Sequence, residues 1–154
     1  MKKYTQEFLD DLLKKAAESP RLRTNYNIHE DTDDPINRLY IAAVPGTEFA
    51  THRHADRWEL VTCLRGSFIS RIFDDNGKVI DEIQMGKEMV SIELPPGTWH
   101  TIEVLTPCVF LEVKKGPYAP VAPEKRRGSI LRSYARFRAA IRSKPSLYPS
   151  ESHQ

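Results

Sequence analysis

The first part of the chain carries apolar side chains at helical spacing. Between residues 5 and 18 they recur every three or four positions, so they would form one stripe on a helix. Thr5 is a suitable N-cap, and Ser19-Pro20 would end the helix, because a proline disfavours helical geometry in the residue before it. The pattern therefore predicts a helix over 5–18, with a stripe formed by Phe8, Leu9, Leu12, Leu13, Ala16 and Ala17.

From residue 36 onward the spacing changes to the runs and alternation that are typical of β-strands. Turn residues separate the runs, and Asn76-Gly77 is a strong hairpin signal between two of them. Short strands at near-regular spacing favour a double-sheet jelly roll or a barrel. The predicted strands are 36–44, 47–54, 58–65, 67–73, 78–84, 89–94, 100–105 and 108–114.

A second helical pattern covers residues 128–143. Its apolar face is formed by Ile130, Tyr134, Phe137 and Ile141. We therefore expect three parts: an N-terminal helix with a lid-like segment over 1–35, a β-barrel over 36–120, and a basic C-terminal helix with its tail over 121–154.

Charge is distributed unevenly along the chain. The formal net charge is +2, but residues 124–154 carry +6 and the rest of the chain carries −4. A basic amphipathic helix can contact nucleic acid or an anionic membrane surface. Because its aromatic residues have the spacing of a packed stripe, we favour packing on the sheet or on a partner subunit over nucleic-acid binding.

The composition is that of an ordinary globular protein, with 40% hydrophobic and 29% charged residues in 154. No stretch approaches the roughly 20 apolar residues of a membrane span. The N-terminal segment lacks an apolar core and is interrupted by acidic residues, so it does not have the pattern of a signal peptide. We expect one domain, without a membrane span, in the cytoplasm.

Two short motifs contain the residues with the clearest chemistry. His52 and His54 would point to one face of a strand, and Glu59 would return on the facing strand. His100 would arrive from a distant strand after a Pro-Gly turn. Three imidazoles and one carboxylate suit Zn, Fe, Mn, Ni or Cu better than Ca or Mg, which prefer oxygen ligands. We therefore predict one divalent transition metal, with Zn, Fe, Mn or Ni as candidates, bound by His52, His54, Glu59 and His100.

These motifs, Gly46-x5-His52-x-His54-x4-Glu59-x6-Gly66 and Pro95-x-Gly97-x2-His100, resemble those of the cupin superfamily over residues 46–104. The first matches the cupin pattern throughout. The second departs from it, because Gly86 lies nine residues before Pro95 and Val104 stands where many cupins have Asn. The resemblance implies a cupin double-stranded β-helix, which is a jelly-roll barrel, here with an N-terminal and a C-terminal helix. It also implies a homodimer, since cupins often pair.

Further stretches are Asp34-Pro35-Ile36-Asn37-Arg38-Leu39, Trp58-Glu59-Leu60, Phe73-Asp74-Asp75, Pro96-Gly97-Thr98-Trp99-His100-Thr101 and Glu112-Val113-Lys114-Lys115-Gly116-Pro117-Tyr118. Through them, roughly residues 15–120 resemble the WbuC family of cupin-fold metalloproteins. That family takes its name from bacterial O-antigen gene clusters and has no settled reaction. The resemblance implies a metal-binding jelly roll and hints at bacterial surface-polysaccharide metabolism. It does not extend to residues 128–143.

Side chains near the predicted metal offer candidates for catalysis and binding. Glu112 and Lys114 share one parity on the last strand, and either could act as a general acid or base if desolvation shifts its pKa. The alternative is a solvated charged pair. Arg38 lies on the strand before the first motif and could bind a carboxylate or phosphate through its two-pronged guanidinium. Tyr118 is a candidate for the rim.

Polar residues alternate in the segment that precedes the barrel. In an extended conformation they would share one edge and could cover the barrel mouth as a lid, whereas a surface loop is the alternative. They are Arg21 and four candidates for substrate binding, Arg23, Asn25, Asn27 and His29.

Three kinds of function fit these residues. A metalloenzyme could act on a sugar, a nucleotide-sugar or a small acid, as an isomerase or epimerase that uses the metal as a Lewis acid. An Fe-dependent dioxygenase would use the same open coordination positions for oxygen. A metal-dependent ligand-binding or sensor module would need no proton transfer. The sequence leaves these three open.

Overall fold

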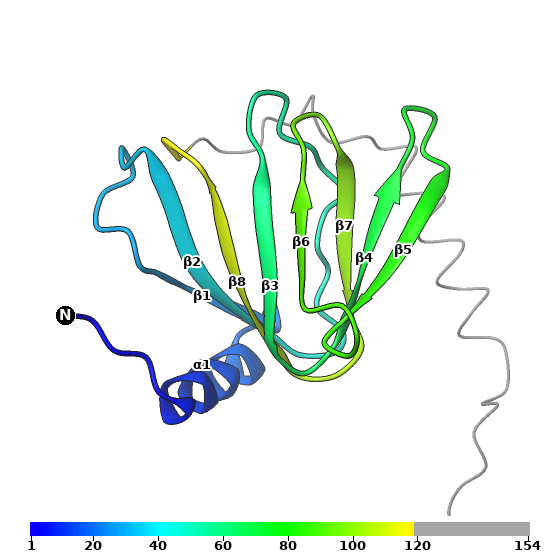
Figure 1. Cartoon of the computed structure of the whole chain (residues 1–154). Coiled ribbons are helices and arrows are strands. Elements are labelled where there is room, and N and C mark those ends of the chain that lie inside the picture. The colour runs from blue at the N-terminus through cyan, green and yellow to red at the C-terminus, as the bar shows by residue number, and fades with distance from the viewer. Residues whose placement is uncertain (119–154) are drawn as a thin grey trace, which may run out of the picture.

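The computed structural model describes residues 1–118, and the predicted helix over 128–143 lies outside them. Within residues 1–118 the chain forms one helix and eight strands in two antiparallel sheets (Figure 1). The larger sheet has the strand order β1-β2-β8-β3-β6, and the smaller has the order β5-β4-β7. The mainly β prediction is thus confirmed.

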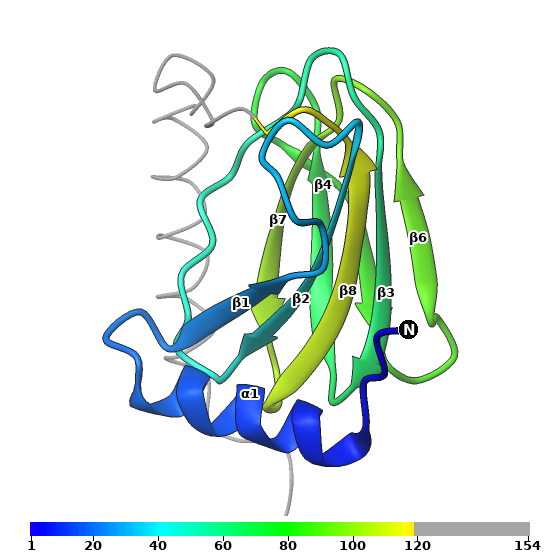
Figure 2. The ribbon, with the colours of Figure 1, turned by 90° about the vertical axis from the view of Figure 1, so that its left-hand side faces the viewer.

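The helix α1, Gln6–Glu18, begins and ends where the sequence predicts. The Thr5 hydroxyl accepts a hydrogen bond from the Phe8 amide at 3.2 Å, and so caps the helix. Leu9, Leu12 and Ala16 are buried against Ala42 and Val109 of the larger sheet. Figure 2 shows α1 running across the lower ends of β2 and β8, on the outer side of this sheet.

The larger sheet contains a strand that the sequence patterns leave as a lid or loop. The strands are β1 (Arg23–Asn27), β2 (Ile36–Ala43), β8 (Cys108–Lys115), β3 (Glu59–Arg65) and β6 (Ser91–Leu94). The polar segment over 23–27 pairs with β2 in antiparallel register, from Arg23 opposite Ala43 to Asn27 opposite Leu39. It is therefore an edge strand of the same sheet that α1 covers.

The smaller sheet consists of β5 (Val79–Met85), β4 (Phe68–Phe73) and β7 (Trp99–Val104). The turn at Asn76-Gly77 joins β4 and β5 as an antiparallel hairpin, which confirms the hairpin signal. Gly77 has a φ of +85°, a backbone region that glycine occupies without steric cost.

The predicted strand over 47–54 is wrong. Only an isolated bridge between His52 and His100 forms there, and the rest of the segment joins no sheet. Side chains satisfy part of its backbone instead. Arg23 Nη1 donates to the Glu48 carbonyl, and the Thr101 hydroxyl donates to the Phe49 carbonyl at 2.8 Å. Such side-chain bonds compete with a strand ladder.

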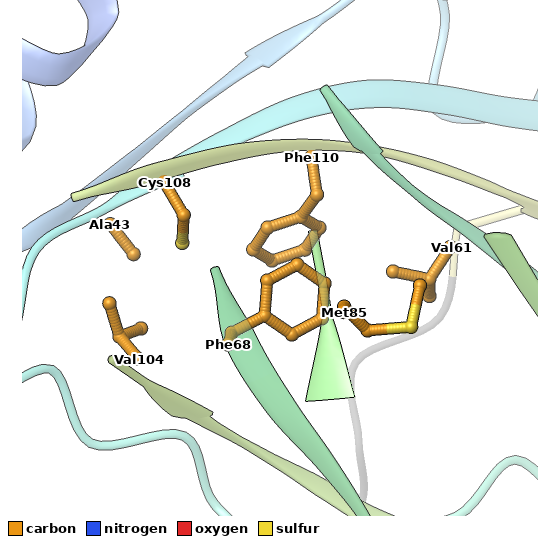
Figure 3. Packing of buried hydrophobic residues seen from close by; sticks show 7 residues of the cluster. All are labelled: Ala43, Val61, Phe68, Met85, Val104, Cys108 and Phe110. Carbon is orange, nitrogen blue, oxygen red and sulfur yellow. The ribbon is translucent and has the colours of Figure 1, made fainter. Parts of the chain in front are cut away.

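The apolar core lies between the two sheets at one end of the strands. Figure 3 shows the rings of Phe68 and Phe110 facing each other from opposite sheets, with their centroids 5.0 Å apart. The cluster also contains Ala43, Val61, Met85, Val104 and Cys108. At the other end of the strands, Asn37 pairs with Lys114, Lys114 with Glu59, and Ile72 with His100. Polar residues therefore occupy the end of the barrel that the core leaves open.

Candidate metal centre

Glu59 is the centre of a buried group of charged and polar side chains. It is the first residue of β3 and is 3% exposed. Its Oε2 lies 3.0 Å from His100 Nε2, and its Oε1 lies 3.2 Å from His54 Nε2. Oε1 also accepts a hydrogen bond from Lys114 Nζ at 3.3 Å. Three elements thus direct polar groups at one carboxylate.

His52 and His54 lie in the segment between β2 and β3 and point the same way, as their alternation predicts. Their ring centroids are 5.1 Å apart, and the His52 ring lies 4.4 Å from that of His100. Arg53, between them, instead lies over the Trp99 ring and forms an ion pair with Asp75. However, the element facing His52 is β7 and not β3, so the predicted pairing of this segment with the Glu59 strand is wrong.

Backbone carbonyls orient two of the imidazole rings in this group. The Nδ1–H groups of His52 and His100 each donate to a backbone carbonyl, of Ala50 and Thr98, at 2.9 Å. In His52 this leaves Nε2 with the lone pair that a metal needs, whereas His100 Nε2 lies 3.0 Å from Glu59 Oε2 and would have to lose its proton to bind a metal. His54 Nε2 is buried and, although it lies near Glu59, has no hydrogen-bond partner among residues 1–118. A buried polar atom without a partner is costly, and a bound cation would satisfy it.

The electrostatics of the group favour a neutral His52 and an ionised Glu59. Burial, with the charge of His100 nearby, lowers the pKa of His52 to about 4, so its ring is neutral at neutral pH. Burial alone would raise the pKa of Glu59, but the hydrogen bond from His100, together with the nearby His54 ring and the charge of Lys114, holds it well below its usual value. Glu59 also raises the pKa of His100 against the opposing effect of burial. The carboxylate is therefore ionised.

The donor set fits a divalent transition metal. The candidate ligand atoms of His52, His54 and Glu59 lie within 4.8 Å of one another, and His100 is in contact with Glu59. A small cavity of about 40 Å³ lies against His52, Glu59 and His100. These four residues could hold the metal, and nitrogen-rich donors of this kind suit Zn, Fe, Mn or Ni.

Lys114 and Glu112 lie beside the group on β8. Lys114 Nζ is 2.6 Å from Glu112 Oε1 and 3.3 Å from Glu59 Oε1. Burial acts to lower the pKa of Lys114, but the two carboxylates raise it above its usual value. Lys114 is therefore an ammonium that neutralises two carboxylates.

A larger cavity of about 450 Å³ opens from the histidines to the wall formed by β1 and β2. Seven of the eight predicted catalytic and substrate-binding residues line it, together with Arg21. The seven are Arg23, Asn25, Asn27, His29, Glu112, Lys114 and Tyr118. Arg38 is not among the lining residues, because it is exposed on the opposite face of β2. The structure thus does not bring Arg38 to this site.

Asn37 is a lining residue that the sequence analysis missed as a candidate. Its side chain is on the inner face of β2, with Leu39 and Ile41, and only 1% of it is exposed. The signal was the alternation of β2, since Leu39 and Ile41 are apolar and share parity with Asn37. That parity predicts Asn37 inside and Arg38 outside.

Residues 4–85, more than half of the chain, match the model of a family described as "Domain of unknown function (DUF6016)". The chain belongs to this family. No curated protein matches it. In residues 1–118, no helix has both the length and the apolar character needed to cross a bilayer.

Solved structures of double-stranded β-helix proteins are similar to this chain. An uncharacterized conserved protein with such a domain from Klebsiella pneumoniae subsp. pneumoniae MGH 78578 has a TM-score of 0.56 at 20% identity, covering 79% of this chain and 96% of that chain. A cupin 2 domain-containing protein from Halorhodospira halophila has a TM-score of 0.55 at 14% identity, covering 82% and 85%. Oxalate oxidase in complex with glycolate has a TM-score of 0.56 at 12% identity, covering 83% and 69%. These similarities show the cupin fold.

Proposed function

We propose that this protein is a metal-dependent cupin enzyme that moves a proton on a small polar molecule, in the manner of an isomerase or epimerase. The observation that supports this best is the position of Lys114. Its ammonium bridges Glu59, a proposed metal ligand, and Glu112, which lines the large cavity. The proposed proton-transfer pair, Lys114 and Glu112, therefore lies directly beside the proposed metal site.

The proposed ligands of the metal are His52, His54, Glu59 and His100. A bound divalent metal would supply Lewis-acid polarisation of a substrate oxygen. Glu112 is the proposed base, because its carboxylate lines the cavity and could accept a proton from a bound molecule. Lys114 would stabilise the ionised carboxylate and supply a proton in the return step. The residues of β1 and β2 would orient the molecule.

The resemblance to the WbuC family supports narrower proposals. The substrate would be a sugar, a nucleotide-sugar or a small acid of bacterial surface-polysaccharide metabolism, in the cytoplasm, and the protein would act as a homodimer. The metabolic setting rests on the resemblance to the WbuC family, and the homodimer on the frequent pairing of cupins.

Metal content tests the first part of the proposal. The full chain is purified without chelator or nickel affinity, and its metals are measured by mass spectrometry. We expect about one equivalent of Zn, Fe, Mn or Ni in the wild type, close to none in His52→Ala/His54→Ala, and the wild-type amount in His29→Ala. His29 is the matched control because it is a buried histidine outside the group, bonded to the Arg38 backbone. No metal in the wild type, even after reconstitution, would contradict the proposal.

Proton transfer is tested by incorporation of solvent deuterium, followed by NMR on glucose 6-phosphate and glucuronate as probes. We expect exchange at a carbon-bound hydrogen with the metal-loaded wild type and its loss in Glu112→Gln, while Glu112→Gln keeps its metal. Ligand binding with no exchange would favour a binding or sensor module instead. Oxygen consumption by an Fe-loaded protein would favour a dioxygenase.

A further inference from the structure

We infer that the cavity wall formed by β1 and β2 recognises a small polyhydroxylated anion, whose carboxylate or phosphate binds Arg23 and one of whose hydroxyls donates to Asn37. This inference names a substrate class for the proposed function. It rests on that function only for the part of the bound anion that would meet the metal. The recognition itself depends on side chains other than the proposed metal ligands.

Arg23 is a cation placed for an external anion. It is half-buried, its guanidinium lies over the Phe49 ring at 4.8 Å from the centroid, and Nη1 donates to the Glu48 carbonyl. These contacts fix the plane of the group and leave most of its five N–H donors for other partners. Among residues 1–118 no carboxylate forms an ion pair with it, although the cavity is beside it.

A second guanidinium, that of Arg21, strengthens the preference of this wall for an anion. Arg21 lies on the same wall two residues earlier, and burial together with the charge of Arg21 lowers the pKa of Arg23. A bound anion would reduce the repulsion between these two positive charges, which no carboxylate in the described part of the chain neutralises. The planar guanidinium can donate two parallel hydrogen bonds to a carboxylate or phosphate. A cationic ligand would meet repulsion here, because Glu112, the carboxylate that lines this cavity from β8, is already paired with Lys114.

Asn37 provides an independent observation from the neighbouring strand. It is 1% exposed, lines the cavity, and its Oδ1 has no hydrogen-bond partner among residues 1–118. Its Nδ2 is occupied with the Asp34 carbonyl at 3.4 Å. Because buried polar atoms normally have partners, this oxygen is an acceptor for a donor on a ligand. A neutral acceptor suits an O–H group and not an anion, so it recognises a different part of the molecule from Arg23.

Asn25 and Asn27 extend the polar wall along the edge strand. The Asn25 amide nitrogen donates to Asn27 Oδ1 at 3.0 Å. The Asn25 side-chain oxygen and the Asn27 side-chain nitrogen are therefore available to a ligand. Leu39 and Ile41 supply an apolar strip between these polar groups. A charged end, several hydroxyls and some C–H surface are together the properties of a sugar acid or a sugar phosphate.

Isothermal titration calorimetry tests the inference on the full chain, both metal-loaded and metal-free. The probes are glucuronate, glucose 6-phosphate, neutral glucose, and hexanoate, which carries the charge without hydroxyls. We expect glucuronate, glucose 6-phosphate or both to bind at least roughly tenfold more tightly than glucose and hexanoate. Preference between the first two distinguishes a carboxylate from a phosphate ligand.

Three variants locate the contacts. Arg23→Gln should remove the advantage of the charged sugar over glucose, whereas Arg38→Gln, on the outer face of the adjacent strand, should retain it. Asn37→Leu should weaken binding of the charged sugar roughly tenfold and leave hexanoate unchanged. If Asn37→Leu does not fold by circular dichroism, Asn37→Ala replaces it, since the smaller side chain avoids a clash.

Equal affinity for glucose and the charged sugars, an unchanged Kd in Arg23→Gln, or no binding of either anion would each overturn the inference. These results are separate from those for the metal. Metal uptake without anion selectivity would support the proposed function and contradict this inference. Anion binding that depends on Arg23, in a protein that takes up no metal, would support this inference and contradict the proposed function.

Discussion

His52 and His100 exchange both of their backbone hydrogen bonds, with His52 N to His100 O at 3.0 Å and His100 N to His52 O at 2.9 Å. The two residues come from motifs that are far apart in the sequence, and their rings lie 4.4 Å apart. Because the backbone makes this pairing, the two rings are brought together before any metal binds. Preorganisation of this kind lowers the cost of forming a metal site.

The buried neutral state of His52 predicts a loss of stability in acid. Its pKa is lowered to about 4 from 6.5, so the unfolded chain binds an extra proton between these values. The stabilising contribution is complete above pH 6.5 and is lost as the pH falls towards 4. Between pH 7 and 4.5 the metal-free wild type should lose about 2 kcal/mol more unfolding free energy than His52→Gln. Urea unfolding at both pH values measures this.

The pKa of His100 is raised, so its effect on stability has the opposite pH dependence to that of His52. His100 is present in both proteins, so the comparison with His52→Gln removes its contribution. Its raised pKa gives stability below pH 6.5 that is lost as the pH rises through the folded value. A wild type that loses no more stability in acid than His52→Gln would contradict the burial of a neutral His52.

Lys114 should stabilise the metal-free protein and compete with the metal. Lys114→Met leaves Glu59 and Glu112 without their shared cation, so the unfolding free energy of the metal-free protein should fall by about 3 kcal/mol. A divalent metal replaces the lost charge. The rise in Tm on metal addition should therefore be larger in Lys114→Met than in the wild type, as thermal unfolding would measure.

Lys115→Met is the matched control, because Lys115 is exposed and follows directly on the same strand. We expect it to change the unfolding free energy by less than about 0.5 kcal/mol. A smaller metal-induced rise in Tm for Lys114→Met than for the wild type would show that Lys114 assists metal binding.

Local patterns were sufficient for much of the fold and for naming the candidate metal ligands that the structure brings together. The helix over 5–18 follows from its cap and stripe, and Asn76-Gly77 gave the β4–β5 hairpin. His52 and His54 point the same way because alternation persists in any extended segment, even though no strand forms there. Residue parity is thus a more robust prediction than strand pairing.

The failures depend on contacts that a single segment does not contain. In the segment over 47–54, Arg23 and Thr101 bond to the Glu48 and Phe49 carbonyls, which a strand ladder would otherwise use. Both residues are distant from this segment in the sequence, so no local pattern indicates these hydrogen bonds. The chemistry of Arg38 suits an anion, but residue parity places it outside, whereas Asn37 shares the parity of the lining residues Leu39 and Ile41.

Phe68 should be a major source of stability but not of metal binding. It is fully buried, with its ring 5.0 Å from that of Phe110, at the core end of the barrel. Phe68→Ala should lower the unfolding free energy by about 3–5 kcal/mol and leave metal content unchanged in the folded fraction. Denaturant unfolding and metal analysis measure these. Ile69→Ala, on the opposite face of β4, should cost distinctly less, and equal costs would contradict the assignment of faces.

Gly66 lies where the chain has no room for a side chain. Its φ is +72°, and a Cβ added there would lie 2.1 Å from the Pro107 carbonyl oxygen and 2.8 Å from the Cys108 Cα. These neighbours are backbone atoms, so they cannot move aside without distorting the β7–β8 turn. Gly66→Ala should therefore lower the unfolding free energy by roughly 2–5 kcal/mol, from backbone strain and overpacking together.

Gly97→Ala separates these two causes. Gly97 has a similar φ of +82°, but a Cβ there would meet nothing within 4 Å. Its substitution should cost only the backbone strain, about 1–2 kcal/mol. Urea unfolding of both variants at pH 7 makes the comparison. An equal loss of unfolding free energy in the two variants would mean that the turn at Pro107 can move to make room for the added methyl group. The close approach of the two chain segments at Gly66 would then not be needed for stability.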